Sequence, residues 1–137
     1  MAPDKEILIV EDSQALADNL KEGLSQFGCV KCKVDCAIDG NEGLKKVKNN
    51  HYDLIITDFV MPKKNGSDFI RELRKINSYK ETPVIFMSGY FKITPIEEYE
   101  DIITEDHMIF LDKPFRLGKI RDAINYVFGG NQLTKTI

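Results

Sequence analysis

The chain has 137 residues, of which 42% are hydrophobic and 30% are charged, and it carries a net charge of −3. This length suits one domain with its own core, and the small negative charge excludes a general electrostatic attraction to nucleic acid or to anionic membranes. Because no apolar run approaches the roughly 20 residues of a membrane-spanning helix, and because residues 1–6 (MAPDKE) are not a signal peptide, we expect a cytoplasmic protein with no membrane partner.

Five short segments have the composition of β-strands. Four of them are largely apolar runs, such as KEILIV at 5–10 and PVIFM at 83–87, which are typical of strands buried on both faces of a sheet. The remaining segment, VKCKVDC at 30–36, alternates between small apolar and polar residues, which predicts a strand with one side toward the core. In chain order, we expect strands at 5–10, 30–36, 53–57, 83–87 and 108–111.

The three cysteines, Cys29, Cys32 and Cys36, include a C-x-x-C spacing of the kind found in zinc sites. A metal site is not the favoured interpretation, because no second C-x-x-C or H-x-x-x-H pair completes a ligand set. Cys32 and Cys36 instead share the apolar side of the alternating strand. We therefore expect them to be small, reduced core residues.

Apolar residues at helical spacing predict helices between the strands. Ser13 is the expected N-cap of the first helix. A turn at Asp39-Gly40 precedes the second, whose lysines, including Lys46, are expected to point to water. The last helix is expected to have Leu117 on its inward face. In chain order, the expected helices are 13–27, about 41–50, one from 67 onward, about 95–104 and about 117–128.

The alternation of strands and helices, with short connections, predicts one α/β domain. Parallel strands need crossover helices, which are right-handed and cover both faces of the sheet. In a doubly wound sheet with the order 2-1-3-4-5, the first and third strands are neighbours. We expect residues 1–128 to form this domain, and residues 129–137 to be a C-terminal tail or the start of a linker.

Polar residues stand at the carboxyl ends of four of the five expected strands. Glu11 and Asp12 follow the first strand, Asp58 closes the third, Ser88 follows the fourth and Lys113 follows the fifth. The carboxyl ends of parallel strands meet at one edge of a sheet, which is where open α/β sheets hold their ligands. We therefore expect the three carboxylates to crowd together at this edge.

Three carboxylates this close cannot all remain charged without compensation, so either a proton is taken up or a cation binds. Hard oxygen ligands at a partly open site suit Mg²⁺, which takes one or two carboxylates together with a phosphate. A cation there would reduce the repulsion between Asp58 and an incoming phosphoryl group. Lys113 and Ser88 are suited to bind phosphoryl oxygens from the other side.

The order of these residues resembles that of a response-regulator receiver domain of two-component signalling, over about residues 5–128. The resemblance implies a flavodoxin-like, chemotaxis-regulator-like fold, with a doubly wound five-stranded parallel sheet and five helices. It also implies a signalling switch rather than an enzyme, with only self-phosphorylation and autodephosphorylation chemistry. The matching motifs are Glu11-Asp12, TDFVMPKKNG around Asp58, Ser88-Gly89 and Lys113-Pro114-Phe115.

The resemblance further implies a role for each matching residue. Asp58 would accept a phosphoryl group from a phosphohistidine of a histidine kinase or histidine phosphotransfer protein. Ser88 and Lys113 would contact the phosphoryl oxygens. The ligands of Mg²⁺ would be Glu11, directly or through water, with Asp12, Asp58 and the backbone carbonyl of Val60.

The family's switch aromatic, often Tyr, corresponds here to Phe110, which can rotate inward but has no hydroxyl. The Lys113-Pro114 bond is expected to be cis, as is usual in the family. The surface that changes is expected to combine 95–104, 108–111 and 117–128. It would bind a downstream output protein rather than nucleic acid, and phosphorylation-dependent dimerisation stays open.

Two enzyme or carrier functions fit the sequence less well. A flavin carrier would need a Ser/Thr/Gly-rich phosphate loop where Glu11-Asp12 stands, and a haloacid-dehalogenase-like phosphatase would need an acid at Val60.

The chain stops about nine residues after the last expected helix, so we expect a single-domain response regulator. The alternative is a receiver domain excised from a larger response regulator or hybrid histidine kinase.

Overall fold

A computed structural model describes residues 5–26, 32–58, 66–88, 107–113 and 115–129. The strands are β1 (Lys5–Val10), β2 (Cys32–Ala37), β3 (Leu54–Asp58), β4 (Val84–Ser88) and β5 (Met108–Asp112). The helices are α1 (Gln14–Gln26), α2 (Gly40–Asn49), α3 (Gly66–Arg74), the short 3₁₀ helix η1 (Asn77–Tyr79) and α5 (Leu117–Gly129). The helix expected at about 95–104 lies outside the described residues.

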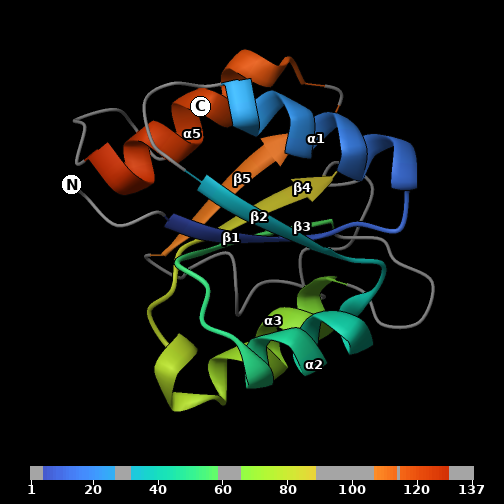
Figure 1. Cartoon of the computed structure of the whole chain (residues 1–137). Coiled ribbons are helices and arrows are strands. Elements are labelled where there is room, and N and C mark those ends of the chain that lie inside the picture. Colours follow the sequence, from blue (N-terminus) through green and yellow to red (C-terminus); the bar gives the residue numbers. More distant parts are fainter. Residues whose placement is uncertain (1–4, 27–31, 59–65, 89–106, 114, 130–137) are drawn as a thin grey trace.

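All five strands are parallel and form one sheet in the order β2-β1-β3-β4-β5. Figure 1 shows α1 and α5 over one face of this sheet and α2 and α3 over the other. The doubly wound α/β fold expected from the sequence is therefore confirmed. Because β1 and β3 are adjacent, their carboxyl ends lie side by side.

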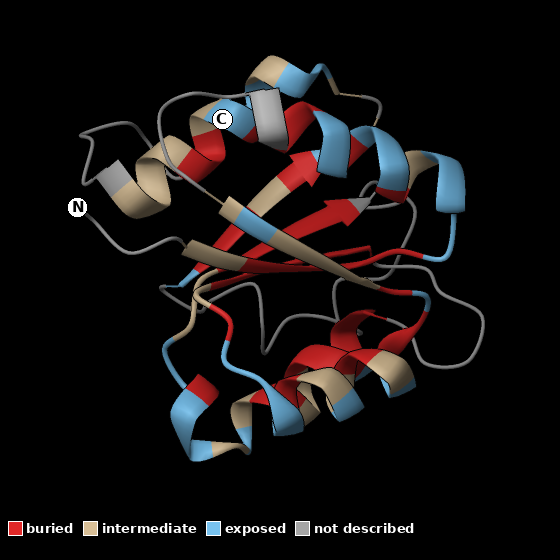
Figure 2. Ribbon diagram, viewed as in Figure 1, coloured by how far each residue is buried: buried red, intermediate tan, exposed pale blue. Residues whose placement is uncertain are grey.

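The central strands are buried on both faces of the sheet. The four residues from Ile7 to Val10 have no exposed surface. Leu8 and Val10 belong to the core beneath α2 and α3, whereas Ile7 and Ile9 belong to the core beneath α1 and α5. Figure 2 shows buried residues along the central strands and on the inner faces of the helices, whereas the edge strand β2 is mostly intermediate or exposed. Within the described residues, no helix has the length and apolar character needed to cross a bilayer.

The edge strand β2 has the alternation expected from its sequence. Cys32, Val34 and Cys36 are half-buried and pack against the core beneath α1 and α5. Cys32 and Cys36 are present as thiols, and burial raises the pKa of the Cys36 thiol. Both therefore fit the role of small core residues, while Cys29 lies outside the described residues.

The turn expected at Asp39-Gly40 is the start of α2 instead. Asp39 is the N-cap of this helix, and its Oδ1 accepts a hydrogen bond from the backbone N–H of Glu42 at 2.8 Å. Gly40 is the first helical residue. An Asp followed by Gly indicates a turn in many contexts, but here the aspartate satisfies an unpaired helical N–H, so the helix begins one residue earlier than expected.

Two side chains differ from the expected orientation. Lys46 does not simply point to water, because its Nζ donates hydrogen bonds to Asp35 Oδ1 at 3.0 Å and to the backbone carbonyl of Cys36. Leu117 is 41% exposed rather than inward. It lies over the backbone of Gly23, where α5 and α1 approach each other. Both differences depend on tertiary neighbours that local spacing does not reveal.

Hydrogen bonds hold together the edge of the sheet where β3 and β1 begin. The Tyr79 hydroxyl donates to the backbone carbonyl of Asn50 at 2.7 Å and accepts from the backbone N–H of Tyr52 at 3.1 Å. The carboxylate of Asp53 accepts from the backbone N–H of Glu6 at 2.8 Å. These contacts fix the start of β3, and thereby the position at which β3 delivers its last residue, Asp58.

We predict that Gly43→Ala destabilises the protein, whereas Gly23→Ala is tolerated. A Cβ at Gly43 would lie 3.0 Å from the ring of Phe69 and 3.2 Å from Val10, both of which are fully buried. Crowding there should outweigh the gain in helix propensity and lower the free energy of unfolding by roughly 1 kcal/mol. Urea denaturation of each variant measures this free energy.

Gly23→Ala is the matched control, because its Cβ would also meet a side-chain carbon at 3.0 Å. That carbon belongs to the half-exposed Leu117, which can move aside. Equal destabilisation by the two substitutions would contradict the difference in packing described for α2 and α1.

Candidate functional site

Three strands deliver charged residues to one edge of the sheet. Asp58 is the last residue of β3, Glu11 and Asp12 follow β1, and Lys113 follows β5. The register pairs Val10 of β1 with Thr57 of β3, so Glu11 and Asp58 are the next residues along two neighbouring strands. The prediction that these ends converge is confirmed for the three carboxylates and the lysine.

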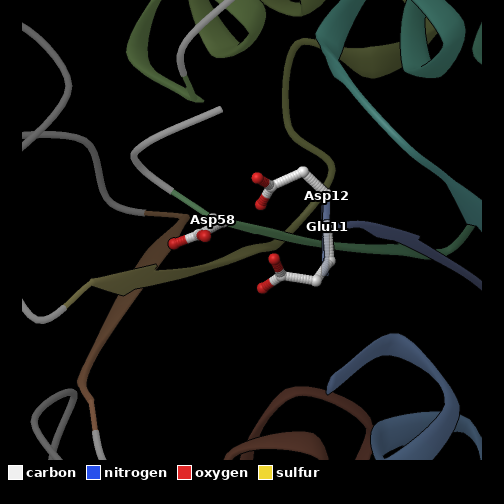
Figure 3. Close-up of side chains that lie close together, drawn as sticks. All are labelled: Glu11, Asp12 and Asp58. Carbon is white, nitrogen blue, oxygen red and sulfur yellow. The ribbon is translucent and has the colours of Figure 1, made fainter. Parts of the chain in front are cut away.

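The carboxylates form a compact cluster. One carboxylate oxygen from each of Glu11, Asp12 and Asp58 lies within 4.8 Å of the others. Figure 3 shows the side chains of Glu11 and Asp12 extending from the end of β1 toward the side on which Asp58 lies. Glu11 is 2% exposed and Asp58 is 7% exposed, whereas Asp12 is open to solvent. The site therefore has a buried floor, made by Glu11 and Asp58, and an exposed rim at Asp12.

Lys113 bridges the two buried acids. Its Nζ lies 3.1 Å from Asp58 Oδ2 and 3.2 Å from Glu11 Oε1. Burial by itself lowers the pKa of Lys113, but the charges of Asp58 and Glu11 raise it more, and the resulting pKa is above the ordinary value. The lysine is thus a permanent cation that compensates part of the negative charge at the site.

Glu11 also organises the loop that leads into α1. Its Oε2 accepts the backbone N–H of Ser13 at 3.0 Å, and the Ser13 hydroxyl accepts the backbone N–H of Leu16 at 3.3 Å. Ser13 therefore caps α1 as expected from the sequence. One oxygen of Glu11 holds the loop while the other meets Lys113, a double role that the sequence pattern did not indicate.

The pKa of Glu11 is raised from 4.5 to about 7. Burial is the main cause, and the hydrogen bond with Asp12 and the charge of Asp58 act in the same direction. The Ser13 N–H and Lys113 act against it. Near neutral pH, Glu11 is therefore poised between holding a proton and carrying a charge that a cation can balance.

The donor set at this edge fits a hard divalent cation. The cluster offers three carboxylate side chains, and the exposed Asp12 leaves room on its rim for water and further ligands. Mg²⁺ characteristically uses one or two carboxylates and retains several waters. The described residues therefore provide suitable chemistry for the cation that the sequence predicted.

Other predicted site residues are described only in part. Ser88 is the last residue of β4, paired with Asp112 of β5, and its side chain lies outside the description. Val60 and Pro114 lie outside the described residues, so the carbonyl ligand and the cis bond remain predictions. Phe110 is half-buried and stacks on Phe86, a contact that the sequence pattern did not single out.

A family model described as the response regulator receiver domain matches residues 7–125 of the chain. The structure is also similar to that of the chemotaxis protein CheY4 of Vibrio cholerae, with a TM-score of 0.79 and 26% sequence identity. That match covers 92% of this chain and 100% of the CheY4 chain. Sequence motif, family model and three-dimensional similarity therefore agree.

Longer proteins contain regions similar to this chain. Response regulator ArlR of Staphylococcus haemolyticus is 35% identical over 88% of the chain and 51% of its own length. Hybrid signal transduction histidine kinase G of Dictyostelium discoideum is 33% identical over 87% of the chain, which is 3% of the kinase. The chain thus spans about half or less of the length of these curated relatives. With its sheet order, its acidic edge and the family match, the chain belongs to the family of response regulator receiver domains.

Proposed function

We propose that this receiver domain is a switch activated by phosphorylation of Asp58. The observation that carries the proposal is the position of this carboxylate at the end of β3, 3.1 Å from Lys113 and within a cluster of three acids. Receiver domains work between histidine kinases and output domains, and their product is a changed protein rather than a released metabolite. The chain is therefore assigned to signalling and not to the enzymes.

The proposed ligands of Mg²⁺ are Asp12 and Asp58, Glu11 directly or through water, and the backbone carbonyl of Val60. When bound, the cation would neutralise charge that otherwise repels a phosphoryl group. Asp12 is the exposed member of the cluster and is suited to receive the cation from solvent. Glu11, which is buried and tied to Ser13 and Lys113, is suited to fix the geometry.

The proposed reaction moves one phosphoryl group from nitrogen to oxygen. A carboxylate oxygen of Asp58 forms a bond to phosphorus while the P–N bond of the phosphohistidine breaks, and the departing imidazole takes up a proton. Lys113 is close enough to Asp58 to contact an oxygen of the transferred group, and Ser88 at the end of β4 is proposed to contact another. The donor is a histidine kinase or a histidine phosphotransfer protein.

The new acyl phosphate carries roughly −1.5 to −2 charges and three acceptor oxygens. In the proposed switch, Ser88 moves toward one oxygen and Phe110 occupies the space that this movement vacates. A population change from 1:99 to 99:1 needs about 5.5 kcal/mol, whereas one charge-assisted hydrogen bond supplies about 1.5–3 kcal/mol. The free energy for this population change must therefore come from the contacts of Ser88 and Lys113 together with repacking.

The proposed output surface combines β5 and α5 with the segment at about 95–104, and it binds a downstream output protein. We propose a single-domain response regulator with residues 1–128 as the receiver. The alternative is a receiver domain from a larger response regulator or hybrid histidine kinase, the two kinds of longer relative that the chain matches. The length of the native reading frame decides between them.

The first test is the intact mass of the protein after incubation with Mg²⁺ and acetyl phosphate. We expect the wild type to gain one phosphoryl group, about 80 Da, because Asp58 is placed for attack on phosphorus. The gain should require Mg²⁺ and should be absent from Asp58→Asn.

Asp112→Asn is the matched control, because Asp112 is an exposed acid at the same edge of the sheet. It should be phosphorylated like the wild type. A mass gain that persists in Asp58→Asn would place the acceptor elsewhere. No gain in the wild type with any donor would leave an unphosphorylated docking module and reject the switch.

A second prediction concerns the pH dependence of stability without metal. The folded chain binds the Glu11 proton more tightly than the unfolded chain, because the pKa of Glu11 is about 7 when folded against 4.5 ordinarily. The free energy of unfolding in EDTA should therefore fall as pH rises through this interval and level off above it. This fall in the free energy of unfolding, on the order of 2 kcal/mol, should be absent from Glu11→Gln.

Urea denaturation at pH 5 and pH 8 measures this difference. Glu22→Gln, at an exposed position of α1, is the control and should keep the wild-type pH dependence. If Glu11→Gln and the wild type lose stability equally between the two pH values, the buried cluster does not hold the proton.

A further inference from the structure

One row of residues connects the phosphoacceptor strand with the edge strand β5. Thr57 of β3 is paired with Phe86 of β4, and Phe86 is paired with Phe110 of β5. Thr57 directly precedes Asp58, and Phe86 lies two residues before Ser88. The row therefore lies just beneath the proposed site and ends at the proposed switch residue.

The two aromatic rings of this row are stacked. Their centroids are 5.8 Å apart and their planes differ by 23°. Such offset, nearly parallel rings are a favourable aromatic arrangement, and the contact adds to the burial of the two side chains. Because Phe110 has no hydroxyl, contacts of its ring, rather than a hydrogen bond from the side chain, must set its orientation.

The two partners differ in how firmly they are held. Phe86 has no exposed surface, and its neighbours along β4, Ile85 and Met87, have none either. Phe110 packs against the same core but is only half-buried, although Met108, two residues earlier on β5, is 1% exposed. Phe86 is thus a fixed surface, and Phe110 is the ring that can change its position.

We propose that Phe86 is a positioning residue for Phe110. The stack holds the Phe110 ring in its resting rotamer, and the strength of the stack sets how readily that ring leaves when Asp58 is phosphorylated. This inference rests on the proposed function, in which Phe110 is the switch residue. It assigns the resting state of the switch to an aromatic contact between β4 and β5.

The test measures the χ1 rotamer populations of Phe110 by NMR, from the three-bond couplings of its ring Cγ to the backbone nitrogen and carbonyl carbon. These couplings report rotamers directly and are not altered by loss of the Phe86 ring current. In the unphosphorylated wild type we expect one dominant rotamer. Phe86→Leu should lower the ratio of the dominant rotamer to the others by about 2- to 12-fold, the range expected for loss of an aromatic pair.

Phe69→Leu is the matched control. Phe69 is also fully buried in the core beneath α2 and α3, but it packs against Gly43 of α2. Its substitution should lower stability while leaving the Phe110 rotamers as in the wild type. Phe86→Met, whose unbranched and flexible side chain can adapt to the space left by the ring, provides a second variant that lacks the aromatic partner.

A redistribution of Phe110 in the Phe86 variants but not in Phe69→Leu supports the inference. Unchanged rotamers in Phe86→Leu and Phe86→Met, or an equal change in Phe69→Leu, overturn it. The measurement needs no phosphodonor, so it is separate from the mass gain that tests phosphorylation of Asp58. If the protein is not phosphorylated but the Phe110 rotamers change in the Phe86 variants, the positioning role of Phe86 is retained. The phosphorylation switch is then rejected.

Discussion

The burial of two carboxylates beside a third is the constraint on which the site depends. Glu11 and Asp58 are almost fully removed from water. An unpaired charge in such a buried position is strongly unfavourable. Lys113 makes this arrangement tolerable because it reaches both acids from the end of β5. The lysine and the acids meet only because β1, β3 and β5 point in the same direction and end at the same edge. The sheet topology thus determines the electrostatics of the site.

The same constraint explains why the site is suited to change its charge. Burial is the main reason that the pKa of Glu11 is raised, and Asp12 and Asp58 add to this effect while Lys113 opposes it. A proton or a cation can balance negative charge at the site, and arrival of a phosphoryl group changes the balance again. The site is open to solvent at Asp12, whereas Glu11 and Asp58, which would take up the proton and the phosphoryl group, are buried.

Much of this fold could be predicted from the sequence, because the buried strands are short apolar runs and the helices have clear apolar faces. The convergence of Glu11, Asp12, Asp58 and Lys113 followed from the strand order, and the structure confirms it. Contacts between distant side chains could not be predicted in this way. The bond from Lys46 to Asp35 and the stack of Phe86 with Phe110 depend on side-chain packing between neighbouring elements, which local spacing does not encode.

Helix α2 packs closely on the sheet at Gly43. A Cβ at this position would lie 3.0 Å from the ring of Phe69 and 3.2 Å from Val10, so the residues packed there have little room to shift. On the β5 side, Phe110 is bordered partly by solvent. The ring of Phe110 therefore has room to move that the residues packed around Gly43 lack.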